Sequence, residues 1–197
     1  MEMPQNKIEI RSIVDNVTTD DNGCTVSGKA ICFDTPTVLY QDPYDGFEYR
    51  EIVSPTALDG CDLTDVPLLY NHDDSKANIL ARCKDGTLTL DKRADSLYFT
   101  ATLNTNLGKD VYTAIKTGDI TGCSFGFYCN GDTTENTEEY SLRTITSISE
   151  LSDISIVDNP ASSRSMKPAV YLGFILLKMA IRLCRKRITA PLTLRRP

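Results

Sequence analysis

The stretch Gly118–Phe127, which reads Gly-Asp-Ile-Thr-Gly-Cys-Ser-Phe-Gly-Phe, limits the fold more than any other part of the chain. Read with the two-residue period of a strand, Cys123, Phe125 and Phe127 share one face and predict a side that packs inward. Ser124 lies on the opposite face between two glycines, which remove bulk beside its hydroxyl and would let a substrate backbone approach a nucleophile. The plainer interpretation of such a residue is a strand serine that only hydrogen-bonds its neighbours.

The spacing Gly122-x-Ser124-x-Gly126 also matches the nucleophile elbow of α/β-hydrolases, which needs a strand, a sharp turn at the serine and then a helix. Here the order is reversed. Apolar residues at helical spacing between Leu107 and Ile115 predict a helix before the serine, and Gly118 fits the position just after its end. An esterase of the elbow type is therefore disfavoured.

Short apolar segments separated by turn signals predict further strands through most of the chain. The segments Ile8–Val14 and Thr25–Phe33, on either side of a turn at Asp20–Gly23, suggest a hairpin. Ser54–Leu58 predicts a short helix. Asn130–Tyr140 is polar, acidic and without an apolar period, which predicts a mobile loop.

The chain contains a single histidine, His72, directly after the predicted strand Val66–Tyr70. Any serine chemistry with an imidazole base must therefore use His72, and strand ends are places where site residues are held. The alternative is a solvated loop histidine. Asp153 lies on the strand face opposite Ile154 and Ile156, where it could orient an imidazole or be an ordinary exposed aspartate.

The composition fits one domain with a sizeable core, because the chain has 197 residues of which 41% are hydrophobic. The seven cysteines are odd in number and form no Cys-x-x-Cys pair, so neither a metal site nor a disulfide framework is expected, and reduced thiols in a cytoplasm fit best. The N-terminus shows no secretory signal. No cofactor is expected.

Charge is divided unevenly, because all 27 acidic residues precede Pro160. An acidic body argues against specific nucleic-acid binding. The apolar run Ala169–Ile181 is about 13 residues long, below the roughly 20 needed to span a bilayer, and basic residues follow it. This tail could dock on a partner, be a segment meant for removal, be poorly ordered, or complete the core as a last helix.

Five short sequence motifs follow one another along the chain in an order that matches a known family. They are Ser27–Ala30, Glu48–Leu58, Val66–Asp73, Gly118–Phe127 and Leu151–Ala161. Together they resemble the prohead (capsid-maturation) serine proteases of tailed bacteriophages over roughly residues 8 to 168. We therefore expect a prohead protease domain over residues 1–168 and an apolar-basic tail over residues 169–197.

The resemblance implies an α+β, mainly β fold like that of the herpesvirus assemblins, with a small closed β-barrel and surrounding helices. It implies catalytic roles for Ser124 as nucleophile, His72 as base and Asp153 as acid, although the family commonly has glutamate at the third position. Glu150 is the alternative third member, but three residues along a regular strand reverse the face, which favours Asp153. Arg143 is a candidate for supporting the oxyanion. No metal is expected.

The resemblance also implies a serine endopeptidase that cleaves a scaffold protein, or the scaffold domain of the major capsid protein, and itself. Such enzymes act inside the immature viral capsid in the host cytoplasm, and their irreversible cleavage commits the shell to expansion. Homo-oligomerisation stays open. A function of another class also stays open: a catalytically silent β-barrel that serves as a scaffold or capsid-interaction module, if Ser124, His72 or the carboxylate does not work.

Overall fold

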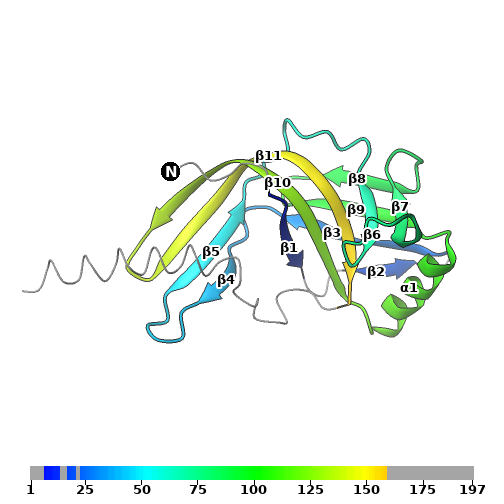
Figure 1. Ribbon diagram of the computed structural model, residues 1–197, viewed down its shortest axis with the longest axis horizontal. Coiled ribbons are helices and arrows are strands. Elements are labelled where there is room, and N and C mark those ends of the chain that lie inside the picture. Colours follow the sequence, from blue (N-terminus) through cyan, green and yellow to red (C-terminus); the bar gives the residue numbers. More distant parts are fainter. Residues whose placement is uncertain (1–6, 14–16, 21–22, 159–197) are drawn as a thin grey trace, which may run out of the picture. The chain divides into compact units, whose positions relative to one another are not determined.

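The computed structural model describes residues 7–13, 17–20 and 23–158 (Figure 1). The predicted domain boundary at residue 168 and the 169–197 tail lie outside the described residues, so both remain predictions. No helix in the described ranges is long and apolar enough to cross a membrane.

The described residues form strands along most of their length, with one 3-10 helix, η1 (Lys76–Asn78), and one α-helix, α1 (Asn106–Thr117). The strands are β1 (Glu9–Ile13), β2 (Thr18–Asp20), β3 (Thr25–Cys32), β4 (Thr37–Gln41), β5 (Glu48–Val53), β6 (Pro67–Tyr70), β7 (Ile79–Arg82), β8 (Leu88–Lys92), β9 (Ser96–Thr102), β10 (Gly122–Asn136) and β11 (Tyr140–Val157).

Two sheets contain these strands. The larger runs β1-β10-β11-β5-β4, and β6 joins it through β11 and carries β7. The smaller runs β2-β3-β9-β8. Because β11 spans 18 residues, its first part pairs in parallel with β5 and its last part pairs in parallel with β6. Figure 1 shows β10 and β11 side by side as two long curved strands, and they form the platform on which the other strands of the larger sheet assemble.

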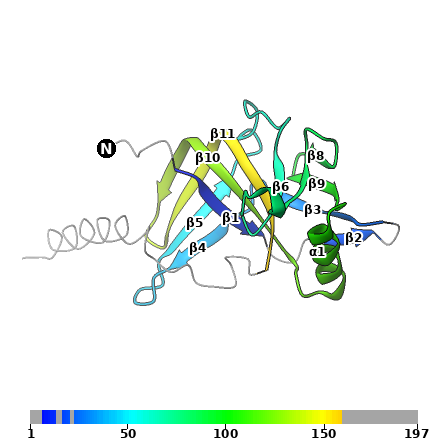
Figure 2. The same cartoon turned by 45° about the vertical axis from the view of Figure 1, so that its right-hand side comes forward.

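The buried core draws apolar side chains from both sheets, including Phe99 from β9, Phe127 from β10 and Ile154 from β11, each at most 1% exposed. The helix α1 adds Val111 and Ile115 to this core. It lies beside β2 (Figure 2), to which the Tyr112 hydroxyl donates a hydrogen bond.

The ends of α1 follow from its sequence. The Thr105 side chain accepts a hydrogen bond from the Gly108 amide, and Gly118 closes the helix in the left-handed conformation at φ 82°. Gly118 therefore occupies the position that the sequence predicts.

Three local predictions are wrong. The strand β1 does not form a hairpin with β3; it pairs with β10, and β3 pairs with β2. The segment predicted as a mobile loop belongs to the hairpin of β10 and β11, and its polarity reflects exposure, which a paired strand tolerates. Residues 54–58 contain no helix, and residues 55–58 form a turn.

The predicted α+β, mainly β class is confirmed. The closed barrel with surrounding helices is not, because within residues 7–13, 17–20 and 23–158 the two sheets stay separate and α1 is the one α-helix.

Candidate active site

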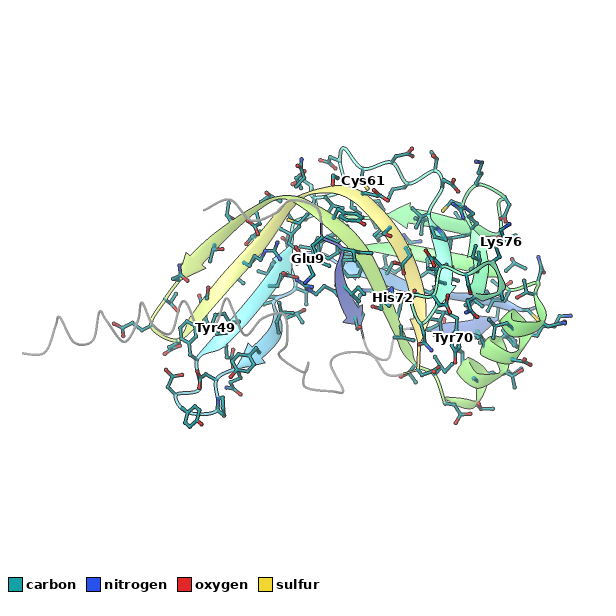
Figure 3. All side chains as sticks on the ribbon, viewed as in Figure 1. Glu9, Tyr49, Cys61, Tyr70, His72 and Lys76 are labelled. Atoms are coloured by element: carbon teal, nitrogen blue, oxygen red, sulfur yellow. The ribbon has the colours of Figure 1, made fainter. Side chains whose placement is uncertain are left out.

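Ser124, His72 and Asp153 come together in the structure from three separate segments. The Nε2 atom of His72 lies 2.7 Å from the Ser124 hydroxyl, and its Nδ1 atom lies 2.6 Å from Oδ1 of Asp153. Figure 3 shows His72 against the β10–β11 pair, which carries the other two residues. The arrangement links a hydroxyl, an imidazole and a carboxylate in one continuous chain of hydrogen bonds, the geometry that nucleophilic serine catalysis requires.

The register of β10 and β11 explains why the serine and the aspartate share a face. Ser124 lies opposite Ser155, and Gly126 lies opposite Asp153. Residues directly opposite each other, and residues two apart along a strand, project from the same side of the sheet. Asp153 is therefore diagonal to Ser124, and one imidazole spans the gap between them.

Gly126 makes room for the Asp153 carboxylate. A Cβ atom on Gly126 would lie 2.4 Å from Oδ2 of Asp153, closer than real carbon contacts allow, and 3.1 Å from Cδ1 of Ile8, a tight contact that a small shift of Ile8 would relieve. The sequence suggested that the glycines admit a substrate backbone. For Gly126 the structure gives a different reason, which is space for the Asp153 carboxylate that contacts His72.

The turn that carries His72 has an unusual backbone. Asn71 and His72 are both left-handed, with φ values of 55° and 59°, a conformation that L-residues hold only when their surroundings stabilise it. The Asn71 amide donates to the Ile156 carbonyl at 3.0 Å. The Asn71 side chain and Asp158 exchange two further hydrogen bonds, of 3.0 and 3.1 Å. These contacts fix the turn to the end of β11.

Ser155 connects the turn to the acid, and sequence reasoning did not assign it a role. Its hydroxyl accepts a hydrogen bond from the His72 backbone amide at 3.1 Å and donates one to Oδ1 of Asp153 at 2.7 Å. Its position two residues from Asp153, on the same strand face, was the available signal. Ser155 is fully buried, and its hydroxyl contacts both the His72 backbone and the Asp153 carboxylate.

The strand β1 covers the Ser124 hydroxyl. Ser12 lies directly opposite Ser124, and the Ser12 hydroxyl donates to the Ser124 oxygen at 3.2 Å. The Ser124 hydroxyl is also placed to donate to the Arg11 carbonyl at 2.8 Å, and Ser124 has no exposed surface. One hydroxyl proton therefore has two acceptors within reach, the Arg11 carbonyl and Nε2 of His72.

Arg143 anchors β1 and does not contact the three central side chains. Its guanidinium pairs with Glu9 at 2.6 Å, with the buried Glu51 at 3.0 Å and with Asp132. Burial alone would lower the pKa of Arg143, but the hydrogen bond and charge of Glu9 outweigh it and raise the pKa. Arg11 binds the same Glu51 at 2.5 Å. These contacts give no support to the expected oxyanion role of Arg143.

Glu150 is exposed and lies opposite Tyr128, whereas Asp153 is buried and bonded to His72. The carboxylate nearest the imidazole is thus that of Asp153. Nowhere in the described part of the chain do three or more histidine, cysteine or carboxylate side chains gather as a metal site would require.

Comparisons with known proteins place the chain in a family. The sequence profile described as caudovirus prohead serine protease matches residues 7–170. Among solved structures the chain is similar to the bacteriophage T4 capsid assembly protease gp21, at 10% identity and a TM-score of 0.45, covering 76% of this chain and 97% of that one. No curated protein sequence matches. Since the profile spans most of its length, the chain belongs to the caudovirus prohead serine protease family.

Proposed function

We propose that the protein is a serine endopeptidase in which Ser124 is the nucleophile, His72 the general base and Asp153 the carboxylate that orients the base. The observation that carries this proposal is the unbroken contact from Ser124 through His72 to Asp153, at 2.7 and 2.6 Å. Membership of a serine protease family supports the same reaction class.

The reaction is acyl transfer. As Ser124 Oγ bonds to a peptide carbonyl carbon, its proton passes to Nε2 of His72, which later gives a proton to the leaving amine as the C–N bond breaks. Water then hydrolyses the acyl-enzyme by the same route. Asp153 holds the proton on Nδ1, so that Nε2 stays free to accept, and it stabilises the imidazolium that forms.

The Arg11 carbonyl must release the Ser124 proton before this can begin. Ser124 is fully covered, so a substrate carbonyl reaches Oγ only when β1 shifts. The structure thus corresponds to a closed state of the proposed enzyme.

Membership of the prohead serine protease family supports a capsid or scaffold protein as the substrate. We propose that the enzyme cleaves the scaffold protein, or the scaffold domain of the major capsid protein, and itself, within the immature capsid during head maturation. Intact-mass measurement after co-expression with the neighbouring capsid-protein gene tests this directly. New termini should appear in the capsid or scaffold chain, and they should be absent when Ser124 is replaced by alanine.

A fluorophosphonate probe tests the chemistry without knowledge of the substrate. The probe should label Ser124 in the wild-type chain, and labelling should fall below detection in Ser124→Ala and in His72→Ala. Ser141→Ala is a matched control, because Ser141 is also a buried serine of the larger sheet but bonds only to Asn136. Labelling that persists in Ser124→Ala would refute the nucleophile.

The burial of Ser124 favours one second candidate, a catalytically silent capsid-interaction module. In that case the Ser124–Arg11 contact would be permanent. A folded wild-type chain that takes up no fluorophosphonate after prolonged incubation, and releases no new termini on co-expression, would support the silent module over the protease.

A further inference from the structure

A groove of about 730 Å³ opens beside the proposed catalytic residues, and both His72 and Asp153 line it. Its other walls come from β6, β7, the segment before β6, the middle of β11 and the chain around β1. An occupant of this groove therefore lies against the base and the acid of the proposed enzyme, whereas Ser124 does not line the groove and is reached only when β1 shifts.

The groove is apolar on one side. Ile8 and Ile10 line it, and each is 37% exposed. They are two of only four large hydrophobic side chains that are exposed among the described residues, and both belong to this groove. Leu69 and Ile79 continue the apolar wall. Uncovered apolar surface rimmed by polar residues is typical of a surface that another chain covers.

The rim of the groove is negatively charged. Asp62, Asp74 and Glu150 line it, all three are exposed, and none forms an ion pair with a cationic side chain in the described ranges. Asp65 differs, because it pairs with Arg82 at 2.5 Å. Three carboxylates without cationic partners on the rim of one groove create a negative potential that attracts cations and repels acidic groups.

We infer that this groove is the substrate-binding groove of the enzyme and selects peptide segments in which apolar side chains alternate with lysine or arginine. The apolar residues would cover Ile8 and Ile10, and the basic residues would meet Asp62, Asp74 and Glu150. An acidic segment would be rejected by the same carboxylates. This inference rests on the proposed function, because it assigns the groove to the substrate of that site.

The test compares two quenched fluorescent peptides, one alternating leucine with lysine and the other alternating leucine with glutamate. The wild-type chain should cleave the lysine peptide at a higher kcat/KM. In the double variant Asp62→Asn, Glu150→Gln, the ratio of the two rates should fall roughly three- to tenfold, the range expected when two exposed charge pairs are lost. Raised salt should reduce the wild-type ratio, because it screens exposed charges.

A matched control removes the same charge elsewhere. Asp110→Asn with Glu135→Gln neutralises two exposed carboxylates, on α1 and on the far part of β10, and should leave the ratio unchanged. An equal fall in both double variants would mean that overall charge sets the preference, and the inference would be overturned. A wild-type chain that cleaves both peptides equally would overturn it as well.

Binding separates this inference from the proposed chemistry. Fluorescence anisotropy with the Ser124→Ala chain should show tighter binding of the lysine peptide, weakened by the Asp62→Asn, Glu150→Gln pair. If binding behaves this way but no variant cleaves or labels, the protease proposal fails, and only the preference of the groove for basic over acidic peptides stands. If the chain cleaves both peptides equally well, the protease proposal stands and the inference about the groove fails.

Discussion

Replacing Gly126 by alanine should inactivate the enzyme without unfolding it. The added methyl group would lie 2.4 Å from Oδ2 of Asp153, whereas ordinary contacts begin near 3.4 Å, so the carboxylate must retreat by about 1 Å. The hydrogen bond from Asp153 to Nδ1 of His72 is 2.6 Å long, and a retreat of that size takes it beyond hydrogen-bonding distance.

The rate loss can be bounded. A misplacement of about 1 Å in a catalytic group costs on the order of 10²-fold, and complete loss of the orienting carboxylate costs about 10⁴-fold in the general triad template. We therefore expect Gly126→Ala to lower kcat/KM by roughly 10²- to 10⁴-fold. Overpacking at this buried site should lower stability by only about 1–3 kcal/mol.

The assay is a double-mutant cycle. Cleavage and thermal unfolding are measured for Gly126→Ala, Asp153→Ala and the two combined. If the methyl group acts through Asp153, it should cost little further activity once the carboxylate is gone. Gly131→Ala is the control on the same strand, where the closest contacts would be 3.3 and 3.4 Å. Fully additive losses, or a Gly126→Ala rate within threefold of wild type, would refute the reasoning.

Three other predictions concern the acid, the anchor of β1 and the tail. Asp153→Asn should lower cleavage by orders of magnitude while Glu150→Gln leaves cleavage of an uncharged peptide nearly unchanged; the reverse ranking in steady-state kinetics would identify Glu150 as the acid. Burial alone would raise the pKa of Glu9, but its hydrogen bonds and ion pairs with Arg143 and Arg11 lower it below 4.5. The ionised Glu9 carboxylate therefore stabilises the fold above that pH, and this stabilisation is lost as pH falls through the folded-state pKa. Glu9→Gln should therefore flatten the acid limb of the melting temperature plotted against pH. The same change should speed fluorophosphonate labelling, because it loosens β1. An unchanged acid limb would contradict this prediction. A chain truncated after Pro168 should remain soluble, melt cooperatively and take up the probe, whereas an insoluble or molten product would place the tail in the core.

Local sequence signals were informative wherever a residue's role depends on its near neighbours. The spacing of apolar residues and the position of Gly118 predict α1 and its end, because capping is a property of one helical turn. Strand parity puts Asp153 on the face opposite Ile154, and the structure has it there, bonded to His72. The same argument put Glu150 on the face of Ile154 and Ile156, but those two residues are buried and Glu150 is exposed, because the register shifts between Asp153 and Leu151 and breaks the regular alternation.

Long-range pairing left no such signal. Ser12 and Ser124 are separated by 112 residues and hydrogen-bond across two strands. The sequence around either serine contains no pattern that predicts this pairing. The turn signal at Asp20–Gly23 predicted that β1 would form a hairpin with β3. Neighbours across strands also determine the space around Gly126, which the sequence shows only as a glycine near a serine. The polar end of β10 was predicted to be a loop because its side chains show no apolar period. It is a strand because its backbone pairs with β11, and side-chain polarity does not reveal backbone pairing.

The strand β1 covers Ser124, so the strength of its pairing with β10 should control access to this serine. No β1 residue belongs to the buried apolar core of the described chain, so β1 is held by its backbone pairing with β10 and by the charges of Glu9 and Arg11. Such a strand leaves its partner at a lower cost than a strand that also buries apolar side chains. In the proposed enzyme only the fraction with β1 opened can react, because β1 covers Ser124, and an opened fraction of about 1% would lower the observed rate about 100-fold. The rate of the proposed reaction is therefore the product of an opening equilibrium and a chemical step, and we expect a change in β1 far from the imidazole to alter the first factor while leaving the second intact.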